Sequence, residues 1–302
     1  MYHRVMNYPI DMQRPIQSGM FVSTSTFQKH LELLQSRFEV LNLQDLIDRL
    51  LAGKSISQCC ALTFDDGWLD NYQNAFPLLQ EFNLPATIFL TTDYIGTNYW
   101  FWPEKISLCL CRLYKDKPAM DMMRNPIRDV IIKAGFFSSL SYEAVLDSLI
   151  ETLKGYSPNE RQNFVEQFAL SCGIQEEKER MLMNWNEVRK MADSRLVNFG
   201  SHTATHELLD QLDSNLIYEE INISKNQIEM ETMQPCTLFA YPNGNYNNTT
   251  IKILKKIGFQ AAVTTKRGFV SHSINITELP RIAMHEDISN NTPLFYWRIL
   301  VR

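Results

Sequence analysis

Short apolar runs alternate with amphipathic segments over most of the chain. The runs at residues 60–64, 85–90 and 261–265 contain no alternating polar positions, which is typical of strands buried on both faces of a parallel sheet. This alternation of strands and helices predicts a parallel sheet or barrel of roughly seven or eight strands. Further strands are expected at 38–41, 197–200 and 237–241, and helices near 27–34, 43–51, 70–82, 185–194, 214–232 and 248–257.

The alternation stops at Gly96 and resumes at about residue 183. The stretch between them has no evident buried strand. It holds an aromatic cluster, Tyr99–Trp102, followed by charged amphipathic segments at 142–153 and 159–170. We therefore expect a helical insertion at about 97–183 within a single domain that spans residues 1–302. In a barrel of this kind, the active-site residues lie at the C-terminal ends of the strands.

Composition and charge exclude several classes of function. At 302 residues, of which 45% are hydrophobic, the chain can bury one large core. The net charge of -5 is mild and there is no basic stripe, so nucleic acid is not an expected partner. No apolar run reaches the roughly 18 residues of a transmembrane helix. The six cysteines lack paired C-x-x-C spacing, which favours buried reduced thiols over a zinc knuckle or a disulfide framework.

The N-terminus has no basic region followed by an apolar core, so the sequence as written contains no signal peptide. On this basis we expect a cytoplasmic protein. A trimmed N-terminus would instead allow a periplasmic or secreted one. The oligomeric state is not indicated by the sequence.

Two polar clusters follow predicted strands. Asp65 and Asp66 follow one strand, and His202 and His206 follow another. One carboxylate and two imidazoles make a three-ligand metal set with a position open for water, and the spare carboxylate can act as a base. Alone, the Asp-Asp-Gly sequence also fits a turn, and the histidines also fit exposed positions at a helix cap. Together they predict a metal-dependent hydrolase, and the ligand types favour one Zn²⁺ ion.

Six motifs occur along the chain in this order: YHRV (2–5), TFDDGW (63–68), WNEVR (185–189), SHTATH (201–206), FAYPNGNY (239–246) and LPRI (279–282). Together they resemble the polysaccharide deacetylases of the NodB-homology group, carbohydrate esterase family 4. The resemblance covers about residues 1–96 and 183–285. It implies a distorted (β/α) barrel of seven to eight strands and the metal-dependent removal of acetyl groups from N-acetylated sugars in polysaccharides.

The resemblance assigns roles to individual residues. Asp65 matches the catalytic base, whereas Asp66, His202 and His206 match the metal ligands. The backbone N–H of Asn243 matches the position that helps to hold the oxyanion.

Aromatic residues near these motifs are candidates for substrate contacts, because an aromatic face covers the apolar side of a sugar ring. The candidates are Trp68, Tyr241 and Tyr246, with the cluster Tyr99–Trp102 as a further one. Packing in the core is the alternative for each of them.

The sequence departs from the family pattern beside the expected base. The family often has an arginine in the third motif that anchors the catalytic aspartate, and this chain has Ala240 there. We expect Arg281 to replace it, because it should end a neighbouring strand and could bind a carboxylate with both arms of its guanidinium. The alternative is a surface arginine that follows a strand proline.

The general acid is the second departure, because the leucine–x–histidine motif that commonly ends the family domain is missing. His3 is the favoured candidate, since a branch of the family that acts on poly-N-acetylglucosamine is similar in YHxV and takes its acid from there. His285 is the main alternative, His272 lies in a polar loop, and a purely structural His3 stays open. His30 is expected to be solvated on a surface helix.

These expectations lead to one favoured function and two alternatives. The favoured function is hydrolysis of N-acetyl groups from an amino sugar in a polysaccharide or glycan precursor of the bacterial cell envelope. The first alternative is a lapsed deacetylase that binds glycan without turnover, which the two departures motivate. The second is another metal hydrolase that cleaves non-peptide C–N bonds on the same barrel.

Overall fold

The computed structural model describes residues 1–7, 16–17, 19–115, 123, 125–174 and 179–300. The chain divides into two compact units. The first, here called the sheet unit, contains Met1–Asn7, Gly19–Thr97 and the residues from Met181 on. The second, here called the helical unit, is built mainly from Asn98–Arg180.

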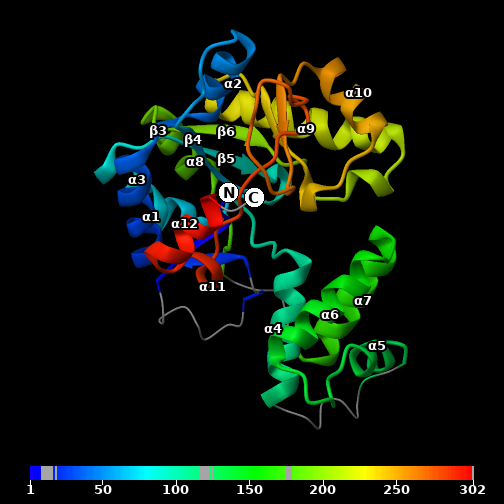
Figure 1. The fold of residues 1–302 in the computed structure, drawn as a ribbon. Helices are drawn as coiled ribbons and strands as arrows, with labels where there is room; N and C mark the ends of the chain where they lie inside the picture. Colours follow the sequence, from blue (N-terminus) through cyan, green and yellow to red (C-terminus); the bar gives the residue numbers. More distant parts are fainter. Residues whose placement is uncertain (8–15, 18, 116–122, 124, 175–178, 301–302) are drawn as a thin grey trace. The chain divides into compact units, whose positions relative to one another are not determined.

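A curled sheet of six parallel strands is the centre of the sheet unit and forms a half-barrel (Figure 1). The strands lie in sequence order, because most of them are followed by a helix that returns the chain to the start of the next strand. This architecture confirms the predicted α/β fold class. The strands are β3 (Glu39–Leu41), β4 (Cys59–Phe64), β5 (Ala86–Leu90), β6 (Val197–Ser201), β7 (Leu238–Ala240) and β8 (Ala261–Val263).

The helices of the sheet unit begin at residues that the sequence marks clearly. Ser23, Asn184 and Asp213 accept hydrogen bonds from backbone N–H groups in the first turns of their helices. These caps explain why the helix starts were predicted within a few residues. The helices are α1 (Thr24–Arg37), α2 (Leu43–Leu51), α3 (Phe76–Phe82), α8 (Trp185–Asp193), α9 (Ser214–Thr232), α10 (Asn248–Ile257), α11 (Glu286–Ser289) and α12 (Thr292–Leu300), with a π-helical turn, η2 (Asn71–Ala75), before α3.

A separate pair of short parallel strands, β1 (Arg4–Met6) and β2 (Phe21–Ser23), lies outside the six-stranded sheet. The residue Tyr2 forms an isolated bridge to Phe64 at the end of β4, and Leu279 forms another to Val263 in β8. These two bridges bring the N-terminal segment and the segment after residue 278 to the C-terminal ends of the strands. Both segments therefore lie near the C-terminal ends of the strands, where the polar motifs are.

The described residues of the helical unit form four helices around an apolar core of their own. No residue described for this unit forms a strand, in agreement with the predicted helical character of this stretch. The aromatic residues Trp100 and Phe101 are buried, so core packing accounts for them. The helices are α4 (Trp102–Lys115), α5 (Ile127–Lys133), α6 (Tyr142–Lys154) and α7 (Pro158–Ser171). Among the described helices of either unit, none has the length and apolar character needed to cross a membrane.

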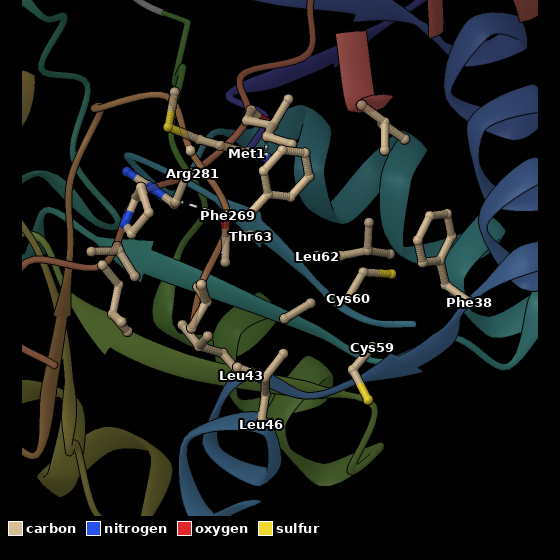
Figure 2. A pocket seen from close by; sticks show the side chains of 18 of the residues that line it. Met1, Phe38, Leu43, Leu46, Cys59, Cys60, Leu62, Thr63, Phe269 and Arg281 are labelled. Atoms are coloured by element: carbon tan, nitrogen blue, oxygen red, sulfur yellow. Dashed lines mark hydrogen bonds between the residues drawn. The ribbon is translucent and has the colours of Figure 1, made fainter. Parts of the chain in front are cut away.

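The strands β3 and β8 are the two edges of the sheet, and a cavity of about 320 Å³ lies inside the half-barrel between them. Figure 2 shows its mainly apolar wall, which includes Leu43 and Leu62. Thr63 and Arg281 lie at one end of it, where Arg281 Nη1 donates to Thr63 Oγ1 at 3.3 Å. Arg281 therefore lines this cavity and also reaches Asp65 at the end of β4.

The expectation that His30 is solvated is wrong. Its side chain is buried, with Nδ1 3.1 Å from the Tyr2 hydroxyl and Nε2 2.7 Å from the Ser289 carbonyl oxygen. The residues that cover it come from both ends of the chain, so the local helical pattern of α1 carries no sign of them. Burial lowers the pKa of His30 to about 4, and it is neutral at neutral pH.

Candidate active site

The Asp65–Asp66–Gly67 turn follows β4 directly and separates two neighbouring carboxylates. Asp66 and Gly67 both have positive φ, at 77° and 84°. A Cβ at Gly67 would lie 2.7 Å from Leu90 Cδ2, so this position requires glycine. Left-handed backbone at a residue with a side chain, such as Asp66, is strained and is often found at functional sites. The turn directs each of the two carboxylates to a different set of partners.

The Asp66 carboxylate faces two imidazoles. Its Oδ1 lies 3.4 Å from His202 Nε2 and 3.4 Å from His206 Nε2. This oxygen is buried and has no hydrogen-bond partner within the described part of the chain. Ligand atoms about 2.0–2.1 Å from a tetrahedral ion are about 3.3 Å apart. The three side chains therefore fit one divalent cation, and the orphaned oxygen is one that such an ion would satisfy.

Backbone contacts hold both histidines in place. His202 Nδ1 lies 2.8 Å from the Ala240 carbonyl oxygen, which can only accept, so Nδ1 carries the proton and Nε2 is left as the free lone pair. His206 has a positive φ of 63°, and its backbone N–H donates to Thr203 Oγ1 at 2.9 Å. Both ligand nitrogens therefore face Asp66.

A half-buried carboxylate on α9 fixes the loop between the histidines. Glu220 Oε2 accepts from the backbone N–H groups of Ala204 and Thr205 at 3.0 and 2.9 Å, and Oε1 accepts from Thr205 Oγ1 at 2.6 Å. Sequence reasoning missed this residue. A glutamate in the middle of an amphipathic helix gives no signal that it binds a loop more than a dozen positions earlier.

The electrostatics of the three candidate ligands suit cation binding. Burial raises the pKa of Asp66, but its close contact with His202 and the charge of His206 outweigh it, so the pKa is well below its usual range. Burial lowers the pKa of His202, yet its contact with Asp66 leaves the pKa above the ordinary value. Burial, with the charge of His202, lowers the pKa of His206 to about 4. At neutral pH the site thus has a charged carboxylate and at least one neutral imidazole.

The neighbouring carboxylate, Asp65, is held by Arg281. Nη1 donates to Oδ1 at 2.7 Å and Nη2 to Oδ2 at 2.6 Å, while Nε donates to the Thr264 carbonyl oxygen at 2.9 Å. Burial raises the pKa of Asp65, but the charge and hydrogen bonds of Arg281 outweigh it and hold the pKa below its ordinary value. Arg281 thus makes the two-armed contact expected from its place in the sequence, and Asp65 is ionised at neutral pH.

His3 lies beside this group of charges. Its side chain is half-buried, and its backbone carbonyl accepts from Asn71 Nδ2 at 2.8 Å. Burial lowers the pKa of His3, whereas the nearby charges of Asp66 and Asp65 act in the opposite direction. The structure brings His3 into the same electrostatic environment as both carboxylates.

The other histidine candidates have different surroundings. His285 Nδ1 pairs with Asp287 at the start of α11, and its ring lies next to Gly19. His272 is exposed. Neither is joined to the carboxylates by a contact in the described part of the chain.

The aromatic candidates differ from one another. Trp68 and Tyr241 are almost completely buried, with Trp68 Nε1 donating to Asp66 Oδ2 at 2.9 Å and the Tyr241 hydroxyl donating to the Thr277 carbonyl oxygen at 2.8 Å. Because neither ring presents a face to solvent, the structure contradicts the sugar contacts predicted for these two residues. Tyr246 is only half-buried, stacks on Tyr241 and donates to Glu278 Oε1 at 2.6 Å. Its substrate contact stays a prediction.

Asn243 lies on the turn after β7, in the 3₁₀ segment η6 (Pro242–Gly244). It is exposed and has a positive φ of 54°, and its side-chain Nδ2 donates to Asn245 Oδ1 at 2.7 Å. The left-handed conformation turns the backbone at the strand end, where a donor to substrate is expected. Its role toward an oxyanion stays a prediction.

A curled parallel sheet with polar residues at its strand ends is the arrangement of barrel-type enzymes. Residues 52–126 and 142–262 match the family model described as polysaccharide deacetylase. This match covers more than half of the chain, and the protein belongs to the polysaccharide deacetylase family.

Individual relatives agree with this assignment. YxkH of Bacillus subtilis (strain 168), itself named as a polysaccharide deacetylase, is 24% identical over 287 residues, which are 94% of this chain and 73% of YxkH. The poly-beta-1,6-N-acetyl-D-glucosamine N-deacetylase of Escherichia coli (strain K12) is 23% identical, and the match covers 92% of this chain and 35% of that protein. The chain therefore spans only about a third of the E. coli relative.

Solved structures share the fold. IcaB from Ammonifex degensii superimposes with a TM-score of 0.61 at 19% identity, covering 98% of this chain and 94% of that one. The Streptococcus pyogenes deacetylase PplD, solved in complex with acetate, gives a TM-score of 0.61 at 18% identity, covering 96% and 92%. At these identities the likeness establishes the half-barrel architecture.

Replacing either histidine of the candidate site should weaken the binding of a divalent cation. His202→Ala and His206→Ala should each lower Zn²⁺ affinity by more than the roughly 10–100-fold that loss of an outer-shell contact costs. In the unmodified protein, affinity should fall as pH is lowered through the raised pKa of His202, because the proton competes for Nε2. Metal analysis and chelator competition measure both effects, with His285→Ala as the control. Undiminished occupancy in both ligand variants would contradict this site.

Breaking the buried ion pair should destabilise the fold. Arg281→Ala leaves the Asp65 carboxylate buried without its partner, which costs about 3–5 kcal/mol in comparable pairs. Arg49→Ala, which removes an exposed contact with Glu39, is the matched control and should change stability little. Urea unfolding at neutral pH measures both variants. Equal stabilities for the two would show that the buried pair contributes no more than a surface pair.

Proposed function

We propose that this protein hydrolyses the N-acetyl groups of an amino sugar in a polysaccharide or glycan precursor. The observation that carries the proposal is that two adjacent carboxylates have different partners. Asp66 offers an orphaned oxygen to the two histidines, while Asp65 is held apart by Arg281 and stays ionised. A hydrolase needs both a cation site and a separate base, and a module that only binds glycan needs neither.

The cation site suits one divalent ion, for which the ligand types favour Zn²⁺. When bound, such an ion polarises the acetamide carbonyl and lowers the pKa of the attacking water. Asp66, His202 and His206 would hold it. The backbone turn at Asp66 and the bonds to Ala240 and Glu220 keep the three ligands oriented before the ion arrives.

Asp65 is the proposed base, because it accepts a proton from the attacking water while remaining fixed in position. Arg281 uses one lone-pair direction on each carboxylate oxygen, which leaves further acceptor positions free for that water. The backbone N–H of Asn243 would donate to the oxyanion that forms on the acetyl carbonyl. His3 would donate a proton to the leaving nitrogen.

The names of the relatives support an N-acetylglucosamine polymer as the substrate class. The E. coli relative is a poly-beta-1,6-N-acetyl-D-glucosamine N-deacetylase, as are several staphylococcal relatives. Short oligosaccharides of N-acetylglucosamine are therefore the first substrates to test.

Acetate release tests the proposal directly. The Zn²⁺-loaded protein should release acetate from N-acetylglucosamine oligosaccharides, and Asp65→Asn should reduce the rate by about 10²–10⁴-fold, because the amide cannot accept the proton. An enzymatic acetate assay with parallel measurement of oligosaccharide binding separates the alternatives. Binding without acetate release over long incubation would favour a lapsed glycan-binding module. Release from cyclic imides rather than sugars would favour another hydrolase of C–N bonds.

The choice of general acid rests on two matched variants. His3→Ala should lower turnover by about 10²–10⁴-fold while metal content and unfolding free energy stay near those of the unmodified protein. His285→Ala should have a much smaller effect, because its ring pairs with Asp287. Steady-state rates on the same oligosaccharide compare them. Near-normal turnover in His3→Ala together with a large loss in His285→Ala would move the acid to His285.

A further inference from the structure

The two oxygens of the Asp66 carboxylate have different environments. Oδ2 accepts a hydrogen bond of 2.9 Å from the indole N–H of Trp68, whereas Oδ1 has no partner in the described part of the chain and faces the two histidines. A free carboxylate can bind a cation through one oxygen or through both. A donor fixed on one oxygen opposes the second mode, because it occupies one lone pair of that oxygen and holds the carboxylate in one orientation.

Trp68 is in turn held by a charged group at the start of β1. The Arg4 guanidinium lies over the indole ring, 4.6 Å from its centroid. Arg4 Nε donates to Asp70 Oδ2 at 2.8 Å, and Asp70 Oδ1 accepts from the backbone N–H of Val5 at 2.9 Å. The Arg4 and Asp70 side chains are only 12% and 9% exposed, so the pair and the cation–π contact are little screened by water.

Backbone contacts complete the support for the ring. Trp68 forms an antiparallel bridge with Leu182, which fixes the backbone from which the indole projects. The side chain is 1% exposed, so the ring is enclosed on all sides. A cation over the ring also withdraws electron density from it and makes the indole N–H a stronger donor. The series Asp70, Arg4, Trp68 and Asp66 thus links β1 and the turn after β4 to a single carboxylate oxygen.

We propose that Trp68, held by Arg4 and Asp70, is a positioning residue that restricts Asp66 to binding the cation through Oδ1 alone. This inference rests on the cation site of the proposed function. Binding through one oxygen keeps a coordination position free for water and the acetyl carbonyl, which a catalytic site needs and a closed structural site lacks. Packing alone does not require the indole nitrogen, since a phenyl ring would fill most of the same space.

The test compares two tryptophans that are both buried and both donate hydrogen bonds. Trp68→Phe removes the donor to Asp66, and Trp100→Phe removes a donor to the Glu179 carbonyl oxygen in the helical unit. Zn²⁺ affinity is measured by chelator competition. The absorption spectrum of the Co²⁺-substituted protein reports the coordination number, because four-coordinate Co²⁺ absorbs more strongly than five- or six-coordinate Co²⁺.

Trp68→Phe should weaken Zn²⁺ binding by about 10–100-fold and lower the intensity of the Co²⁺ bands, as Asp66 becomes free to bind through both oxygens. Trp100→Phe should change neither. Arg4→Gln should shift the Co²⁺ spectrum in the same direction as Trp68→Phe by a smaller amount, and Arg4→Lys, which keeps a positive charge near the ring, should recover part of the difference.

The outcomes separate this inference from the function on which it rests. An unmodified protein that binds neither Zn²⁺ nor Co²⁺ would overturn the cation site itself. Normal metal binding in the unmodified protein, with unchanged affinity and spectrum in Trp68→Phe, would overturn the positioning role alone. If Trp68→Phe fails to fold, Arg4→Gln decides, and an unchanged Co²⁺ spectrum in that variant overturns the inference.

Discussion

The rest of the site depends on the buried ion pair between Arg281 and Asp65. This pair ties the segment that follows β8 to the turn that follows β4, two elements at different positions in the curled sheet. It also keeps the Asp65 carboxylate on Arg281, so that only its neighbour Asp66 faces the two histidines. Without that separation, adjacent carboxylates would repel each other, and one of them would tend to take up a proton. One arginine therefore determines which of the two carboxylates is left to face the histidines.

Much of the fold follows from local patterns in the sequence. Unbroken apolar runs such as 60–64 and 86–90 are typical of strands covered on both faces, and both are strands in the structure. The capped amphipathic segments between the strands are helices that return the chain to the start of the next parallel strand. The parallel order then places the residues after each strand at one edge of the sheet. For this reason Asp65, Asp66 and the two histidines could be grouped from the sequence, and Arg281 could be matched to Asp65 before any distance was known.

Other features depend on contacts between distant segments, which no local pattern records. His30 has the spacing of an ordinary helix residue, yet the N-terminal segment and the end of α11 cover it. Trp68 and Tyr241 were expected to face a sugar because aromatic residues occur beside the motifs, but neighbouring elements enclose both rings. Glu220 supports the histidine loop by accepting hydrogen bonds from backbone N–H groups. Because every residue except proline has such a group, the sequence does not show which residues Glu220 contacts.

The left-handed backbone at Asp66, His206 and Asn243 has a consequence for how this site could change over time. Each of these residues costs free energy in a conformation that glycine would adopt without strain. If the chemistry were no longer needed, a substitution to glycine at any of them would relieve this backbone strain, at the loss of the contacts that the side chain makes. The strain at Asp66 and His206 is therefore expected to persist only while their side chains are needed at the candidate cation site.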